Sequence, residues 1–266
     1  MPQPWRRVKE AIRRIPWIGG LAQATYLALR KELALRNEVE RQLLFGVDYV
    51  YCSAVPGDVA EFGTCSGDTA LTIARALADW EERDPDIVAK RFHLFDSFEG
   101  FPEFGSAIDR DCHHAKSGDW RPGSCKGLDR AQLERLLRRV LPPDELEFHE
   151  GWYRDTVPRL SAGVTFAMLH LDCDLYESTT DALDTLFARN QVAEGAVLFF
   201  DAWNCNRASP DHGQRKAWAD LARKYAIEAS DGGDYSWEGH KILVHRYRAT
   251  QAMPPVSSVA RKGTLA

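Results

Sequence analysis

Short apolar runs alternate with amphipathic segments along most of this 266-residue chain. The runs predict strands, and the segments with apolar residues three or four positions apart predict helices. The run VTFAMLHLD (164–172) is almost wholly apolar, as expected of a strand whose two faces are both covered. Alternating strands and helices predict an α/β fold, doubly wound around a mainly parallel sheet. The predicted strands are 58–63, 91–97, 145–151, 164–172, 195–201 and 241–247, and the predicted helices are 68–83, 128–141, 178–190 and 213–226.

The two ends of the chain have different patterns. Residues 1–48 predict helices with one apolar face, and basic residues outnumber acidic ones there. We expect a helical cap or a contact between copies, hence a homo-oligomer; a helix lying on a membrane surface is the alternative. Residues 251–266 predict a disordered tail. The main domain is therefore expected at 49–250, and within it the non-periodic segment 98–127 has the length and composition of a lid that carries acceptor specificity.

Composition narrows the possible functions. The net charge of −5 argues against a nucleic-acid partner, and no apolar run approaches the roughly 20 residues that a membrane span needs. The basic N-terminus lacks the apolar core of a signal peptide, so we expect a soluble, cytoplasmic protein. Six cysteines without a CxxC pair indicate reduced thiols. The cluster Cys112, His113, His114 with Cys125 fits no common structural zinc spacing.

Acidic residues and glycines gather where the predicted strands end. Ligands in doubly wound sheets bind beyond the carboxyl ends of the strands, so these residues should meet at one edge. The stretch LHLDCDLYEST (169–179) is the clearest case, because two acids, Asp172 and Asp174, end an apolar run and a third, Glu177, follows almost at once. The strand-end residues are Glu61, Phe62, Gly63, Asp96, Gly151, Asp172 and Asp201.

The stretch EFGTCSGDTA (61–70) places Gly63 and Gly67 between a strand and a helix. Glycines let a ligand approach the backbone, and the helix N-terminus offers free N–H groups. The spacing is neither that of a dinucleotide-binding loop nor that of a P-loop. Asp96, at the end of the next strand, can accept hydrogen bonds from both hydroxyls of a ribose; capping of a turn is the alternative.

The motifs EFGTCSGDT, LFDSFEGFPE, EGWYRDTVP, LDCDLYEST and GAVLFFDAW follow one another along the chain. In these motifs and their order, residues 45–250 resemble the macrocin and mycinamicin sugar O-methyltransferases (TylF/MycF type), which are class I S-adenosylmethionine-dependent enzymes. The resemblance implies a seven-stranded, Rossmann-like sheet and S-adenosylmethionine as methyl donor. It also implies that Asp96 binds the ribose and that Ser97 and Phe98 lie near the adenosine. The other implied cofactor-binding residues are Glu61, Phe62, Gly63, Thr64, Gly67, Thr69, Gly151, Trp152 and Asp172.

The same resemblance gives roles to the acids of DCDLYEST. Asp172 is implied to ligate a divalent cation, usually Mg²⁺, and Asp174 to be the general base that deprotonates a sugar hydroxyl. The chemistry is sound, because a cation lowers the hydroxyl pKa while a carboxylate takes the proton. The alternative is that Asp172, Asp174 and Ser178 cap the helix that starts near residue 178. The family has two consecutive acids at the next strand end, but this chain has Asp201 followed by Ala202, which leaves Asp172 and Asp201 as the predicted metal ligands.

Two histidines have open roles. His212 is a candidate second base or substrate contact, or else a loop histidine exposed to solvent, and His170 is expected to be packed in the core. The leading hypothesis is O-methylation of a small molecule, with a glycosylated natural product such as an antibiotic as the expected acceptor. The alternatives are a metal-independent methyltransferase acting on a non-sugar acceptor and a cofactor-binding homologue without catalysis, and Ala202 favours both.

Overall fold

The structure, a computed structural model, describes residues 38–250. Its seven strands form one sheet in the order β3-β2-β1-β4-β5-β7-β6. Neighbouring strands from β3 to β5 are parallel, and β7 runs antiparallel to β5 and β6. This confirms the predicted doubly wound α/β fold. The strands are β1 (Asp58–Phe62), β2 (Phe92–Asp96), β3 (Leu146–Glu150), β4 (Phe166–Leu171), β5 (Val192–Phe200), β6 (Glu228–Asp234) and β7 (His240–Arg246).

The order of the strands reverses between β1 and β4. The chain builds outward from β1 to β3 on one side and then returns to start β4 on the other. The loops after β1 and β4 therefore diverge and leave a crevice at the carboxyl ends of these two strands. Gly63 follows β1 and Asp172 follows β4, so both lie at this position in the fold.

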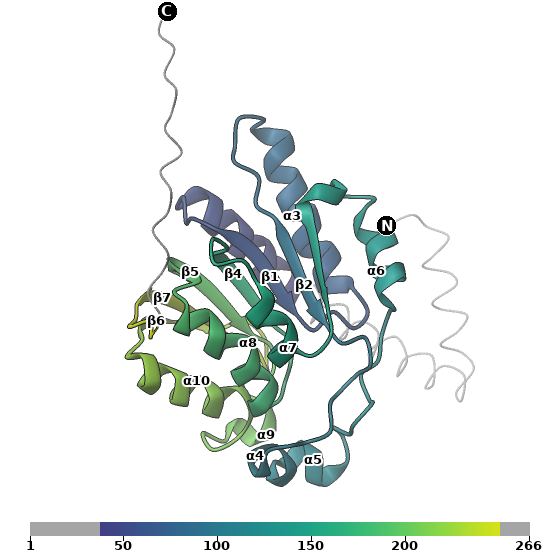
Figure 1. Cartoon of the computed structure of the whole chain (residues 1–266), viewed down its shortest axis with the longest axis vertical. Coiled ribbons are helices and arrows are strands. Elements are labelled where there is room, and N and C mark those ends of the chain that lie inside the picture. Colours follow the sequence, from purple (N-terminus) through teal and green to yellow (C-terminus); the bar gives the residue numbers. More distant parts are fainter. Residues whose placement is uncertain (1–37, 251–266) are drawn as a thin grey trace, which may run out of the picture. The chain divides into compact units, whose positions relative to one another are not determined.

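Helices cover both faces of the sheet (Figure 1). On one face Phe200 of β5 packs on Trp218, with 5.7 Å between ring centroids, beneath α8 and α10. On the other face Phe199 lies against Gly46 of a helix at 38–52, and Tyr51 of that helix stacks on Trp80 of α3. Adjacent residues of β5 thus serve opposite layers, as the strand's two-residue period requires. The helices are α3 (Asp68–Arg83), α4 (Ala107–Asp111), α5 (His113–Ser117), α6 (Arg130–Leu137), α7 (Tyr153–Thr156), α8 (Tyr176–Ala188), α9 (Cys205–Ala208) and α10 (Gly213–Tyr225).

Three elements differ from the sequence-based prediction. Strand β6 has the sequence EASDGGD, without an apolar run, because it is the outer strand of the sheet and its residues are exposed or only partly buried. Its pairing with β7 holds it in place. The segment 98–127 contains the short helices α4 and α5. Helix α6 starts later than predicted, because Asp129 caps it by accepting from the Gln132 N–H at 2.7 Å.

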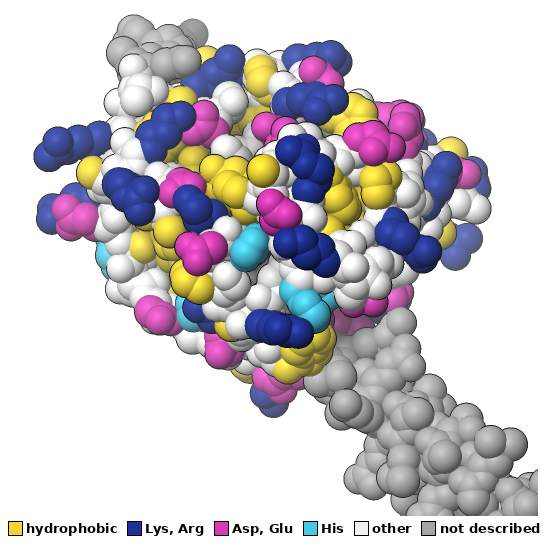
Figure 2. Space-filling model, turned by 90° about the horizontal axis from the view of Figure 1, so that it is seen from below, with side chains coloured by type: hydrophobic (Ala, Val, Ile, Leu, Met, Phe, Trp, Pro, Cys, Tyr) yellow, Lys and Arg dark blue, Asp and Glu magenta, His cyan; other side chains and the backbone are white. Residues whose placement is uncertain are grey.

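The predictions for the chain ends fall largely outside the described residues. Of the predicted helical region 1–48, the structure describes residues 38–48, which are helical. The tail at 251–266 lies outside the described part. In residues 38–250 we find no helix with the length and apolar character that crossing a membrane requires. On the face drawn in Figure 2, Lys and Arg side chains are interspersed with Asp and Glu.

Candidate active site

A cavity lies at the carboxyl ends of β1, β2 and β4, where the strand order reverses. The loops after these strands and after β3 form its walls, and segment 98–127 contributes one side. The structure therefore brings together the strand-end residues that the sequence singled out. Those lining the cavity are Gly63, Asp96, Ser97, Trp152, Asp172 and Asp174.

Gly63 lets the loops after β1 and β4 approach closely. Its φ is +90°, and a Cβ at this position would overlap the carbonyl oxygen of Asp172. Gly67 also has a positive φ of +77° and directly precedes α3, where a Cβ would meet Leu133 of α6. Both glycines are thus required by the backbone conformation and by the close packing around them.

Asp96 is held in a fixed orientation by three hydrogen bonds. Its Oδ2 accepts from the backbone N–H of Thr64 at 2.7 Å and from the Thr64 hydroxyl at 2.8 Å, and its Oδ1 accepts from the Phe98 N–H at 2.7 Å. A carboxylate offers about four lone-pair positions, so Asp96 keeps acceptor capacity on the cavity side. This fixed acceptor suits a ligand with hydroxyl groups. The predicted neighbour Ser97 lines the cavity beside it.

Asp172 and Asp174 follow β4 in an irregular turn. The Asp172 N–H donates to the carbonyl of Phe62 at 2.9 Å, which ties the turn to β1, and Asp174 has a left-handed φ of +55°. Burial, reinforced by the charge of Asp201, raises the pKa of both carboxyls, that of Asp174 to about 7. Burial and Asp201 also raise the pKa of Glu238, in the β6–β7 turn, to about 7. This edge of the sheet therefore concentrates carboxylates that favour protons or another positive charge.

The metal ligands that the resemblance implies are incomplete. Asp201 accepts a hydrogen bond from the Tyr235 hydroxyl at 3.1 Å. Ala202 is buried in an apolar cluster with Cys112, Trp120 and Leu175, and its N–H donates to Gln214. Among residues 38–250, no group of three or more His, Cys, Asp or Glu side chains is arranged to hold a metal ion. A three-carboxylate cage therefore does not fit this chain, and two carboxylates remain.

Several predicted site residues lie away from the cavity wall. Glu61 and His170 are fully buried and form a pair, with 2.9 Å between Glu61 Oε1 and His170 Nδ1. Phe62 stacks on Phe95 in the core at 4.4 Å between ring centroids. His212 directly precedes α10, where its Nδ1 lies 3.1 Å from the Ser209 hydroxyl. None of these side chains is part of the cavity lining, and neither are Thr64, Gly67, Thr69, Phe98, Gly151 and Asp201.

The cavity also contains residues that were not among the predicted site residues. Glu177 and Asp181 are four residues apart and therefore lie on one face of α8. Burial, with the charge of Glu177, raises the pKa of Asp181 to about 6. The helical period of α8 could have indicated this pair. The other lining residues fall within segment 98–127 or within the quoted motifs, but no role in this site was predicted for them individually. These are Cys65, Gly100, Phe101, Pro102, Glu103, Cys125, Tyr153, Arg154, Cys173 and Ser178.

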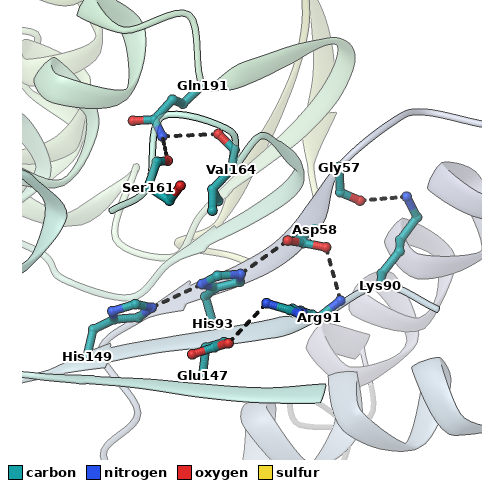
Figure 3. Close-up of polar contacts among 10 residues, drawn as sticks. All are labelled: Gly57, Asp58, Lys90, Arg91, His93, Glu147, His149, Ser161, Val164 and Gln191. Carbon is teal, nitrogen blue, oxygen red and sulfur yellow. Dashed lines mark hydrogen bonds and ion pairs between the residues drawn. The ribbon is translucent and has the colours of Figure 1, made fainter. Parts of the chain in front are cut away.

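A second polar cluster lies on the sheet outside the cavity lining (Figure 3). His93 on β2 bridges two partners: its Nδ1 lies 3.0 Å from Nε2 of His149, and its Nε2 lies 3.2 Å from Oδ2 of Asp58. Burial and the neighbouring His93 lower the pKa of His149 to about 4. His149 also stacks on Phe95 with 4.2 Å between ring centroids. The three polar side chains come from neighbouring strands β1, β2 and β3 and hold one another in place, which is a structural role.

Comparisons with known proteins identify the family of this chain. The family model of macrocin-O-methyltransferase (TylF) matches residues 38–229. A similar protein is 8-demethyl-8-(2,3-dimethoxy-alpha-L-rhamnosyl)-tetracenomycin-C 4'-O-methyltransferase of Streptomyces olivaceus, 32% identical over 202 residues that cover 73% of this chain and 70% of that protein. Demethyldecarbamoylnovobiocin O-methyltransferase of Streptomyces niveus is 29% identical over 70% of this chain and 68% of its own length.

Solved structures show the same fold. The O-methyltransferase NovP superposes with a TM-score of 0.63 at 25% identity, covering 79% of this chain and 80% of NovP. The calicheamicin methyltransferase CalS11 has a TM-score of 0.57 at 22% identity, over 91% of this chain and 93% of its own, and supports the fold alone. The family model, the 32% identical relative and the strand-end cavity lead to one conclusion: the chain belongs to the macrocin O-methyltransferase (TylF) family and is a methyltransferase.

Proposed function

We propose that this protein transfers the methyl group of S-adenosylmethionine to a hydroxyl group on the sugar of a glycosylated natural product. The observation that carries the proposal is the cavity that joins Asp96 to Asp172 and Asp174 where the strand order reverses. Relatives named for methylation of a rhamnosyl tetracenomycin and of mycinamicin III support a sugar as acceptor. Segment 98–127 forms one wall of the cavity, and in this proposal it selects among acceptors that differ outside the methylated sugar.

In this proposal the cofactor lies across the ends of β1 and β2. Asp96, fixed by Thr64 and Phe98, accepts hydrogen bonds from the ribose hydroxyls. Gly63 lines the cavity, so the methionine part lies beside the loop after β1 in this proposal. The sulfonium is positively charged, and the carboxylates at the end of β4 stabilise that charge.

Asp174 is proposed as the general base. A sugar hydroxyl has a pKa far above neutral, so its proton must leave as the oxygen attacks the methyl carbon. The new O–CH₃ bond forms while the S–CH₃ bond breaks, S-adenosylhomocysteine departs, and Asp174 receives the proton. A base works best when its pKa lies near the working pH, and the pKa of Asp174 is about 7. A positioned base typically contributes ~10²–10⁴-fold to the rate.

Asp172 and Asp201 are the residues that would hold Mg²⁺ in this proposal. When bound, such an ion lowers the pKa of the acceptor hydroxyl and orients it. Magnesium commonly binds one or two carboxylates together with waters and substrate oxygens, so two carboxylates are a usable set.

A metal-independent methyltransferase with a non-sugar acceptor is the second candidate. The burial of Ala202 among Cys112, Trp120 and Leu175 favours it, because this position faces apolar side chains. In that case Asp174 alone activates the acceptor.

The test measures S-adenosylhomocysteine formation with three acceptors: the demethylated tetracenomycin rhamnoside, demethyldecarbamoylnovobiocin and mycinamicin III. We expect turnover with at least one sugar acceptor and an Asp174→Asn variant that is slower by ~10²–10⁴-fold. Loss of activity in EDTA that Mg²⁺ restores supports the two-carboxylate site, and full activity in EDTA supports the metal-independent candidate. Absence of turnover with every acceptor would contradict the proposal.

A further inference from the structure

Segment 98–127 supplies a cap to a helix that is distant from it in sequence. Helix α8 begins at Tyr176, and its N-cap residue, Leu175, has no side-chain oxygen to accept from the first free N–H groups. Asp109 of α4 provides both acceptors: its Oδ1 accepts from the Tyr176 N–H at 2.8 Å and its Oδ2 from the Glu177 N–H at 3.0 Å. A carboxylate at a helix N-terminus is also stabilised by the helix dipole.

The contact is reciprocal. Glu177 Oε2 accepts from the backbone N–H of Ser106, at 3.1 Å, just before α4. The Ser106 hydroxyl caps α4 by accepting from the Asp109 N–H at 3.0 Å. Asp109 of segment 98–127 therefore caps α8, and Glu177 of α8 binds the N-cap residue of α4 in return. The exchange resembles a capping box, but it joins two separate parts of the chain.

The carboxylate of Asp109 is almost wholly enclosed, with 1% of the residue exposed. Burying a carboxylate destabilises the folded state unless its oxygens are hydrogen-bonded, and both oxygens of Asp109 bind N–H groups of α8. Figure 1 shows α4 and α5 side by side at the edge of the sheet where the strand-end loops gather.

The cap lies two residues after Asp174. Asp174 has a left-handed φ, and the turn from Asp172 to Leu175 is short, with the Leu175 N–H donating to the Cys173 carbonyl at 2.5 Å. The start of α8 therefore sets where this turn ends and where the Asp174 carboxylate points. Movement of the α8 N-terminus would displace Asp174 with it.

We propose that Asp109 is a positioning residue: docking of segment 98–127 onto α8 places Asp174 to accept the proton of the acceptor. This inference rests on the proposed function, in which Asp174 is the base. Closure over the acceptor and completion of the catalytic geometry thereby become one event. An open segment 98–127 leaves the first turn of α8 uncapped and Asp174 misplaced.

A second contact of the same segment offers a comparison. His114 of α5 touches Asn206 of α9 through its side chain, whose Nδ1 accepts from the Asn206 backbone N–H at 3.0 Å. This contact fastens segment 98–127 without involving α8. An His114→Ala change therefore loosens the segment but leaves the cap on α8, whereas Asp109→Ala removes both the docking and the cap.

The experiment compares Asp109→Ala, Asp109→Asn and His114→Ala, with Asp111→Ala on the exposed side of α4 as the matched control. Steady-state kinetics use S-adenosylmethionine and whichever acceptor the wild type methylates. We expect Asp109→Ala to lower kcat at least ~10-fold, because a misplaced catalytic group costs that much or more. Asn keeps one acceptor oxygen and should restore part of kcat. His114→Ala should raise KM for the acceptor and leave kcat within about twofold, and Asp111→Ala should resemble the wild type.

Amide hydrogen exchange at Tyr176 and Glu177 provides a readout independent of turnover. With S-adenosylhomocysteine present, these amides should exchange at least ~10-fold faster in Asp109→Ala than in the wild type or His114→Ala. Unchanged exchange, or a kcat for Asp109→Ala equal to that of Asp111→Ala, overturns the inference while leaving the proposed function intact. A wild type that methylates none of the acceptors counts against the proposed function, and the exchange rates then decide whether Asp109 holds the start of α8.

Discussion

Replacing Asp174 by Asn should slow the enzyme and stabilise its fold. Burial and the charges of Asp201 and Glu238 raise the pKa of Asp174 from 3.8 to about 7. In the unfolded chain the carboxyl ionises near its ordinary pKa, so ionisation favours unfolding as the pH rises from about 4 to about 7. Above that range, the charge on Asp174 destabilises the native state. Asn at this position is neutral at every pH and has no such effect.

The size of this destabilisation follows from the two pKa values. A rise from 3.8 to about 7 corresponds to about 4 kcal/mol of native-state destabilisation at pH 8, which is an upper bound. The neighbouring acids can take up protons themselves, which reduces the repulsion on Asp174. We therefore expect Asp174→Asn to be more stable than the wild type by about 1–3 kcal/mol at pH 8. Near pH 4 the difference between the two proteins should be much smaller, since Asp174 is then protonated in the native state and still partly protonated in the unfolded chain.

Urea unfolding in EDTA at about pH 4.5 and about pH 8 measures the difference by linear extrapolation. EDTA removes divalent cations that would offset the repulsion. Asp111→Asn, an exposed acid whose side chain is 65% accessible, is the control and should change stability little at either pH. The reasoning is refuted if Asp174→Asn is no more stable than the wild type at the higher pH, or if its advantage does not depend on pH.

Three further changes test other parts of the structure by unfolding measurements. Gly63→Ala should destabilise by about 1–3 kcal/mol more than Gly118→Ala, because both have positive φ but only Gly63 faces a carbonyl oxygen; equal losses would contradict the close approach. As the pH falls from about 6.5 to about 4, the unfolding free energy of the wild type should decrease by about 1–2 kcal/mol more than that of His149→Phe, because His149 is protonated in the unfolded chain before it is protonated in the folded protein. Parallel pH curves of the two proteins would contradict this. Ala202→Asp should destabilise by at least roughly 1–3 kcal/mol in EDTA, because it buries a carboxylate among Cys112, Trp120 and Leu175; an unchanged Tm would contradict that environment.

The strands and the cavity edge could be predicted because they depend on local patterns. The apolar run that becomes β4 is buried at every residue, and the acids and glycines at the strand ends follow from the geometry of a parallel sheet. Gly63 and Asp96 were recognised for this reason. Both line the cavity, and the contacts of Asp96 with Thr64 and Phe98 hold its carboxylate in place.

Features that depend on distant contacts could not be predicted. Strand β6 is polar and is defined by its partner β7, so its own sequence carries no strand signal. Asp109 lies in a segment without periodicity, and its hydrogen bond to the start of α8 depends on a contact between residues that are distant in sequence. The burial of Glu61 against His170 depends on the register of β1 with β4, in which the two residues are direct partners.

The most direct test of the central claim identifies the atom that is methylated. Purified protein is incubated with S-adenosylmethionine and each of the three acceptors, and the product is analysed by mass spectrometry and NMR. We predict a product heavier by one methylene unit, with the new methyl on a sugar oxygen, together with S-adenosylhomocysteine and with little product from Asp174→Asn. Methylation at a non-sugar position, or no product although S-adenosylhomocysteine binds, would contradict the account.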